Sequence, residues 1–184
     1  MNLIAIDPGT TESAYVSYDS TERKILGYGK ARNEMVLEAL KRTQLRVLVI
    51  EMLACYGMPV GKSVFETALW IGRFIQAWDR PYNLLYRREV KMHLCGSVKA
   101  KDSNIRQALI DKFGSPGTKK NQGKTYGIAA DVWAALGVAV TFVEVNNGLS
   151  NVGLNAGTPG GHRALAKTGR GNKKENPAAG ASEK

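Results

Sequence analysis

The sequence predicts an α/β protein in which a mixed β-sheet is flanked by helices on both faces. Three strand-like segments open the chain, strand-like and helical segments then alternate, and one central segment is apolar almost throughout. Such an apolar strand is typical of a sheet covered on either side. We expect one domain over residues 1–146. A flexible basic tail is expected over 147–184, where Gly, Ala, Asn and Pro dominate and large apolar residues are few.

The first half of the chain supplies most of the predicted sheet. Runs of alternating polarity predict strands at 2–7, 13–19 and 24–31. Asn33 is expected to cap the helix that follows, because its side chain can accept a hydrogen bond from a free backbone amide. The run RVLVIEML at 46–53 predicts a strand that is buried on both faces.

The second half is predicted to be mainly helical. Ser63 is expected to cap a long amphipathic helix, and Ser103 a shorter one. A strand is predicted at 83–88, between these two helices. A loop rich in Gly and Lys is predicted over 114–127, followed by a final helix from 128 to 145.

The aromatic residues of the long helix have a structural interpretation. Trp70, Phe74 and Trp78 recur at helical spacing, which favours the core or a dimer interface over a surface that stacks bases. Phe65, near the start of the same helix, is also expected in the core.

Charge and composition narrow the functional classes. The formal net charge of +10 favours a polyanionic partner, nucleic acid first and an anionic membrane second. The longest largely apolar stretch, 132–143, is far shorter than the ~20 residues that span a bilayer, so a membrane protein is not expected. The two cysteines, Cys55 and Cys95, form no disulfide framework and indicate a cytoplasmic protein.

Three carboxylates lie in apolar surroundings at positions where α/β proteins place their chemistry. Asp7 ends the first strand, Glu51 lies within the apolar strand, and Asp131 lies in the first turns of the final helix. Taken singly, the three can be explained by a turn, a basic partner and a favourable helix N-terminus, respectively. Taken together they would repel one another, and an all-oxygen set of this kind favours Mg²⁺ or Mn²⁺.

Four segments, taken in order over residues 2–143, resemble the RuvC-type Holliday junction resolvases, particularly those of bacteriophage type: IAIDPGTTES, VLVIEML, VKMHLCGSVKAKDSNIRQAL and AADVWAALGVAV. The resemblance implies an RNase H-like fold and Asp7, Glu51 and Asp131 as catalytic metal ligands. It implies two Mg²⁺ ions per site, with Mn²⁺ as a substitute, and phosphodiester hydrolysis. It also implies a homodimer that cuts four-way and related branched DNA.

The chain departs from this family at one position. The family usually has a fourth acidic or histidine residue three positions before the last Asp, on the same helical face, and here that position is Ile128. A module that binds junctions with weak or no cleavage therefore stays open as the alternative.

Basic residues concentrate in one stretch of the chain. Segment 87–124 has ten Lys or Arg against three acids, and three of its lysines fall in the Gly-rich loop, where flexible cations suit phosphate contacts. Two residues of the loop after Glu51 are expected to stack on or wedge against unpaired bases. The residues expected to contact DNA are Tyr56, Met58, Lys62, Arg88, Lys91, Lys99, Lys101, Lys119, Lys120 and Lys124.

Two nucleotide-binding patterns can be set aside. The run GMPVGKS has three residues between Gly57 and Gly61 where a P-loop needs four, and Pro59 removes an amide donor. The run IDPGTT resembles the phosphate loop of the actin and sugar-kinase ATPases. Those proteins enclose a nucleotide between two such lobes, whereas 184 residues provide one. No nucleotide cofactor is expected.

Overall fold

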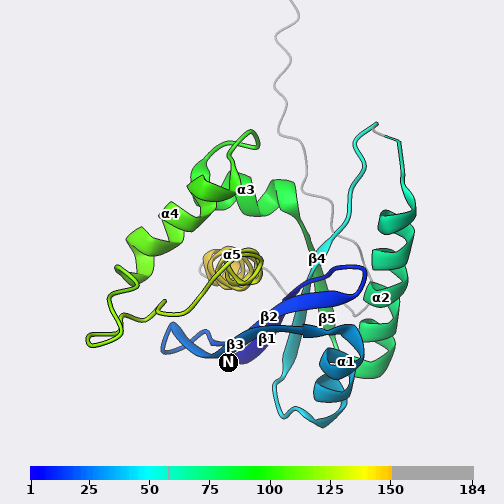
Figure 1. Ribbon diagram of the computed structural model, residues 1–184, viewed down its shortest axis with the longest axis horizontal. Helices are drawn as coiled ribbons and strands as arrows, with labels where there is room; N and C mark the ends of the chain where they lie inside the picture. The colour runs from blue at the N-terminus through cyan, green and yellow to red at the C-terminus, as the bar shows by residue number, and fades with distance from the viewer. Residues whose placement is uncertain (58, 151–184) are drawn as a thin grey trace, which may run out of the picture.

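Five strands form one mixed sheet in the order β3–β2–β1–β4–β5 (Figure 1). The computed structural model describes the backbone of residues 1–57 and 59–150 and the side chains of residues 1–57 and 59–147. The first three strands form an antiparallel meander, whereas β1, β4 and β5 run parallel to one another. The strands are β1 (Asn2–Asp7), β2 (Glu12–Asp19), β3 (Lys24–Arg32), β4 (Val47–Met52) and β5 (Tyr82–Tyr86).

Helices cover both faces of this sheet, which confirms the predicted fold class. On one face α5 (Val132–Ser150) packs against β1 and β2, with α3 (Arg87–Cys95) and α4 (Asp102–Phe113) packed on α5 (Figure 1). On the other face lie α1 (Asn33–Arg42) and α2 (Lys62–Trp78). None of the described helices is long and apolar enough to cross a membrane.

The alternation of side chains along β1 separates two cores. Leu3 and Ala5 are buried on the side of α5, whereas Ile4 and Ile6 are buried against α1 and α2. Ile6 pairs with Ile50 of the parallel strand β4. The next residues, Asp7 and Glu51, therefore occupy adjacent positions on neighbouring strands and share the α5 face of the sheet.

The final helix begins later than the sequence predicts. It starts at Val132, not at 128, because Ala130 adopts a left-handed conformation (φ 43°) that interrupts the helix. Asp131 immediately precedes the helix, and its carbonyl oxygen accepts the backbone amides of Ala134 and Ala135. Ile128 shares no helical face with Asp131 and is instead buried in the core.

The predicted helix caps are each wrong by one or two positions. Asn33, Ser63 and Ser103 lie within the helices they were expected to cap, and Arg32, Gly61 and Lys101 occupy the cap positions. The side chain of Asn33 is engaged elsewhere, as described below.

The predicted strand at 83–88 is too long, because α3 begins at Arg87. The backbone amide of Tyr86, the last residue of β5, donates to the Glu89 carboxylate, and this bond favours the start of a helix.

Aromatic side chains of α2 behave partly as predicted. Phe74 and Trp78 are buried in the core, and Trp70 is half-buried beside Phe74. Phe65 was expected in the core, but it is 61% exposed, because α2 turns this side chain away from the sheet.

The division of the chain at residue 146 stays a prediction. Helix α5 continues to Ser150, four residues past that boundary. Residues 151–184, most of the predicted tail, lie outside the described residues.

Candidate active site

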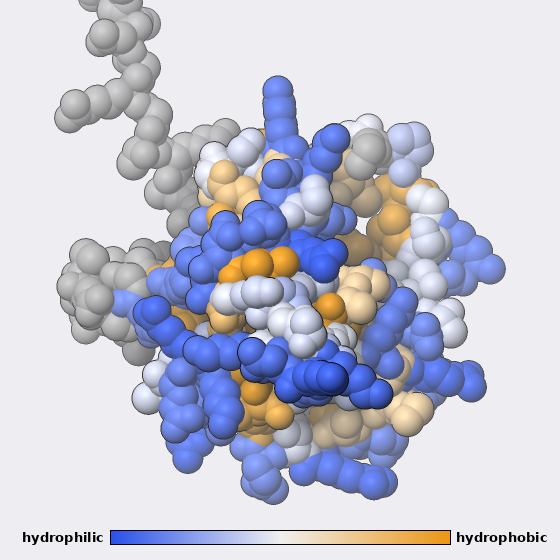
Figure 2. Space-filling view, turned by 60° about the vertical axis from the view of Figure 1, so that its left-hand side comes forward, coloured by the Kyte–Doolittle hydropathy of each residue, from blue (hydrophilic) through white to orange (hydrophobic). Residues whose placement is uncertain are grey.

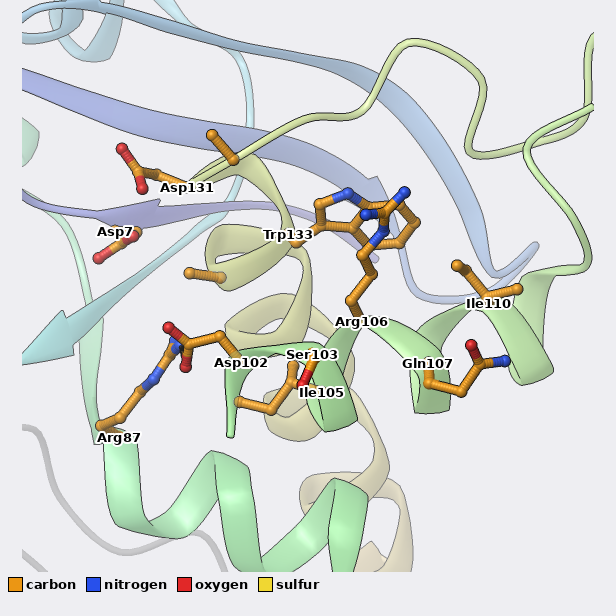
Figure 3. A pocket seen from close by; sticks show the side chains of 12 residues that line it. Asp7, Arg87, Asp102, Ser103, Ile105, Arg106, Gln107, Ile110, Asp131 and Trp133 are labelled. Carbon is orange, nitrogen blue, oxygen red and sulfur yellow. Dashed lines mark hydrogen bonds and ion pairs between the residues drawn. The ribbon is translucent and has the colours of Figure 1, made fainter. Parts of the chain in front are cut away.

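The three predicted carboxylates lie at one end of the sheet. Asp7 and Glu51 come from the carboxyl ends of β1 and β4, and Asp131 comes from the residue before α5. Asp7 and Asp131 line the same cavity, which has a volume of about 640 Å³ (Figure 3). Glu51 is close enough to Asp7 to act on its charge. The fold thus brings together three acids that are far apart in the sequence.

Asp7 is the carboxylate under the greatest electrostatic stress. Burial and the neighbouring charge of Glu51 raise the pKa of Asp7 to about 7. The charge of Arg87 opposes this rise, and Asp131 and Asp102 add smaller contributions to it. Among the described residues no side chain forms an ion pair with Asp7 or donates a hydrogen bond to its carboxylate. Asp7 therefore has an unmet preference for a cation.

Glu51 is held by Arg87, the first residue of α3. Arg87 Nη1 lies 3.1 Å from Glu51 Oε2, and its Nη2 lies 2.5 Å from Asp102 Oδ1. The Glu51 side chain is only 12% exposed. Burial raises the pKa of Glu51, although the charge and hydrogen bond of Arg87 oppose the rise. One guanidinium thus bridges the end of β4 and the start of α4.

Asp131 is held by Lys30 of β3. Lys30 Nζ lies 2.8 Å from Asp131 Oδ2, and a longer contact of 3.9 Å joins it to Glu12. The hydrogen bond and charge of Asp131 raise the pKa of Lys30. Lys30 and Asp131 also line a second hollow of about 420 Å³, so that Asp131 stands between the two cavities.

A buried hydrogen-bond network fixes the turn that follows Asp7. Ser13 Oγ donates to Asn33 Oδ1 (2.6 Å), Asn33 Nδ2 donates to the carbonyl oxygen of Gly9 (2.9 Å), and the Gly9 amide donates to Ser13 Oγ (3.3 Å). A Cβ atom at Gly9 would lie 2.4 Å from the Glu12 carbonyl oxygen, so only glycine fits there. The start of α1 thereby holds the β1–β2 turn in place.

The donor set fits a hard divalent cation, although it is not assembled around one. Asp7, Glu51 and Asp131 offer oxygen atoms only, and Asp7 forms no ion pair with a described side chain, although the charge of Arg87 acts on it from a distance. Within the described residues no three His, Cys, Asp or Glu side chains stand close enough to form a ready-made ion site. The ion pairs with Arg87 and Lys30 hold the two outer carboxylates.

Asp102 is a fourth carboxylate at this site that the sequence did not indicate. It lies in the first turn of α4, lines the cavity with Asp7, and contributes to the raised pKa of Asp7 (Figure 3). In the sequence it is one acid within a basic segment. Only the fold shows that it faces the carboxylates.

The other end of the cavity is apolar and basic. Ile105 and Ile110 of α4 line it together with Trp133 of α5 (Figure 3). The Arg106 guanidinium lies 5.5 Å from the centre of the Trp133 ring. The Trp133 Nε1 atom is buried and has no hydrogen-bond partner within the part of the chain that the structure describes. An acidic end beside an apolar and basic end suits a molecule that has both charged and flat apolar parts, as a nucleotide does.

The residues predicted to contact DNA are spread over several elements, and none of those that the structure describes lines either cavity. Tyr56 is 64% exposed in the loop after β4. Lys62 begins α2 and pairs with Glu66, and Lys91 of α3 is near enough to lower the pKa of Glu51. Met58 lies outside the described residues. The remaining residues are exposed, Arg88 on α3, Lys99 and Lys101 before α4, and Lys119, Lys120 and Lys124 in the loop before α5.

Four basic residues that line the cavities were missed. Arg87 and Arg106 line the larger cavity, and Lys30 and Arg32 line the smaller one. Arg87 and Arg106 fall in the basic segment 87–124, whose charge predicted DNA contacts in general but did not distinguish these two residues from the others. Nothing in the sequence indicated Lys30 and Arg32, because their cavity forms only when β3 meets the residue before α5.

Comparisons with known proteins support the fold. No protein-family model matches the sequence, and no curated protein matches it. Among solved structures, Thermus thermophilus RuvC is similar with a TM-score of 0.62 and 16% identity, over 80% of this chain and 97% of that one. T. thermophilus RuvC in complex with a Holliday junction substrate gives a TM-score of 0.61 and 16% identity, over 80% of this chain and 96% of that one. The chain therefore has a RuvC-like, RNase H-like fold.

Proposed function

We propose that this protein is a metal-dependent endonuclease of the bacteriophage RuvC type, which resolves four-way and related branched DNA by hydrolysing phosphodiester bonds. The observation that supports this most is the arrangement of Asp7, Glu51 and Asp131 at one end of a RuvC-like sheet. The strained, unpartnered carboxylate of Asp7 is the expected centre of ion binding.

Each carboxylate has a role in this proposal. Asp7 would hold both of two Mg²⁺ or Mn²⁺ ions, Glu51 would hold one and Asp131 the other. Asp7 and Glu51 lie at or near the ends of β1 and β4, and Asp131 directly precedes α5. When bound, such ions lower the pKa of water and stabilise the charge that develops on the leaving oxygen. The apolar core beneath Asp7 limits the access of bulk water, which strengthens electrostatic interactions at this end of the sheet.

The basic surface is proposed to bind the DNA backbone. The face with α4 and the loop before α5 is largely hydrophilic, with apolar patches between charged side chains (Figure 2). Exposed lysines on this loop suit sequence-tolerant phosphate contacts. Exposed Tyr56 is proposed to stack on unpaired bases, as is Met58, and the apolar end of the larger cavity suits a nucleotide beside the cut.

A homodimer is part of the proposal, because two symmetric cuts need two symmetric active sites. Phe65 and Leu69 of α2 are 61% and 70% exposed and lie one helical turn apart. Apolar side chains that are exposed in this way suit a surface between two copies.

A synthetic four-way junction tests this function. We expect the protein to cut it in Mg²⁺ and in Mn²⁺. Asp7→Asn should bind the junction with unchanged affinity but fail to cut it, because it removes an ion ligand and leaves the basic surface intact. Asp111→Asn is the matched control, since Asp111 is exposed on α4 outside the cavity, and this variant should cut normally.

The second candidate is a junction-binding module with weak or no cleavage. Two observations favour it: a buried isoleucine, Ile128, stands at the sequence position where the family usually has a fourth ligand, and Arg87 and Lys30 already neutralise two carboxylates. Tight junction binding without cutting in either ion would support this module and reject the nuclease. Loss of binding as well as cutting in Asp7→Asn would instead indicate a structural role for Asp7.

A further inference from the structure

Two basic side chains hold the outer members of the carboxylate cluster. Arg87 holds Glu51 at 3.1 Å from α3, and Lys30 holds Asp131 at 2.8 Å from β3. Asp7, between them, has no such partner among the described residues. In this arrangement two protein cations neutralise the carboxylates that a divalent ion would need.

Arg87 is the more firmly held of the two. Its side chain is 27% exposed, and the two terminal nitrogens of its guanidinium contact Glu51 and Asp102, respectively. Lys30 is 42% exposed, so water screens its charge more strongly. A guanidinium in a partly buried site keeps its charge and its fork geometry, because arginine does not lose its proton. Arg87 is therefore a permanent positive charge beside the cluster.

A fixed positive charge should weaken the binding of a divalent ion in two ways. It occupies Oε2 of Glu51, one of the two oxygen atoms that this carboxylate offers to an ion, and it repels the ion through space. A single and a double charge roughly 6 Å apart repel by about tenfold in binding constant even at the dielectric constant of water. Removing Arg87 should therefore raise the affinity for the ion, whereas removing a residue that merely supports the structure of the site would lower it.

We propose that Arg87, anchored by Asp102, is a built-in counter-ion of the carboxylate cluster that competes with the divalent ion for Glu51. Arg87 is thus a positioning residue: its contacts with Glu51 and Asp102 hold the Glu51 carboxylate in place before the ion binds, and they lower the affinity for the ion. The inference rests on the proposed function, because it assumes that the ion binds at Asp7 and Glu51. It adds that this chain limits its own affinity for the ion.

The test is a titration of the full-length protein with Mn²⁺, in which free Mn²⁺ is measured by electron paramagnetic resonance. Arg87→Gln should bind Mn²⁺ about tenfold more tightly than the unmodified protein. Arg87→Lys keeps the charge and should restore the original affinity. Arg42→Gln is the matched control: it removes the same charge from α1, on the other face of the sheet, where the Arg42 side chain is 82% exposed, and it should leave the affinity unchanged.

The outcomes separate this inference from the proposed function. If Asp7→Asn does not weaken Mn²⁺ binding, the ion site of the proposed function is wrong. If binding depends on Asp7 but Arg87→Gln binds Mn²⁺ equally or less tightly, the counter-ion role is overturned and the ion site stands.

A second measurement needs no variant and therefore does not depend on Arg87→Gln being folded. In crystals of the unmodified protein soaked in Mn²⁺, the contact between Arg87 and Glu51 should break as Glu51 turns to the ion. An ion bound to Glu51 with the 3.1 Å contact intact would overturn the proposal.

Discussion

Asp7 is the residue whose environment is most unusual for its chemistry. It ends a strand in which the four residues before it are fully or almost fully buried, and it has Glu51 beside it on the neighbouring strand. A carboxylate in such a place resists ionisation, which explains why its pKa rises from 3.8 to about 7. Because this strain costs stability, it indicates that the position serves a purpose other than folding.

The pH dependence of stability should report this strain. The pKa of Asp7 is higher in the folded than in the unfolded state, so the folded state binds the proton more tightly. The contribution of Asp7 to the free energy of unfolding is therefore greatest below about pH 4 and is lost as the pH rises to about 7. The loss is about 4 kcal/mol at most. Urea unfolding in EDTA from pH 4 to 8 measures it.

The variant Asp7→Asn isolates this contribution from those of other groups. Glu51 also has a raised pKa, so the free energy of unfolding of the variant should still fall as the pH rises, but less steeply than that of the unmodified protein. At pH 8 without divalent ions, Asp7→Asn should be more stable than the unmodified protein. Equal slopes in the two proteins would show that Asp7 is not strained.

At the scale of elements, the turn between β1 and β2 depends on the first residue of α1. Asn33 is fully buried and joins Ser13 to the carbonyl oxygen of Gly9, two residues after Asp7. This network couples the position of Asp7 to a helix on the opposite face of the sheet. It also explains why Asn33 does not cap the helix.

Replacing Asn33 by Ala should lower the free energy of unfolding by about 2 kcal/mol, because Ser13 and Gly9 lose buried hydrogen bonds. It should also reduce junction cutting, since the turn after Asp7 loosens. Asn83→Ala, at an exposed position on β5, is the control and should change neither property. Full stability in Asn33→Ala would mean that this network contributes nothing.

The elements also show where sequence reasoning succeeds and fails. The alternation in β1 and the apolar run of β4 predicted the two buried strands, because burial on both faces leaves a plain pattern. The start of α5 could not be predicted, because Ala favours helices and yet Ala130 is left-handed here.

At the site, the same limit applies. Asp7, Glu51 and Asp131 stood out as acids in apolar surroundings, and the fold gathers them. The sequence did not single out Arg87, Asp102 or Lys30. They form ion pairs with residues that are distant in the sequence, and such pairs produce no local sequence pattern.

At the scale of the whole molecule, the chain has a formal net charge of +10, although several carboxylates gather at one end of its sheet. The body of the chain has a basic excess of its own beyond that of residues 151–184, in which six Lys or Arg stand against two Glu. Such a basic excess attracts a polyanion to the surface of the molecule. It suits a protein that contacts the phosphate backbone of DNA.

Removing two lysines of the loop before α5 tests this view. Lys119→Ala combined with Lys120→Ala should weaken junction binding and reduce the slope of log affinity against log salt concentration by about two, because two phosphate contacts are lost. Lys41→Ala combined with Arg42→Ala removes the same charge from α1 and should leave the slope unchanged. Equal slopes for both double variants would show that the loop does not touch DNA.

The most direct measurement is the anomalous scattering of Mn²⁺ in crystals of the protein, recorded at the end of the sheet where β1 and β4 finish. We expect manganese within bonding distance of a carboxylate oxygen of Asp7, with Glu51 or Asp131 as a further ligand. Crystals that take up Mn²⁺ elsewhere, while these three side chains keep their present partners, would contradict the account.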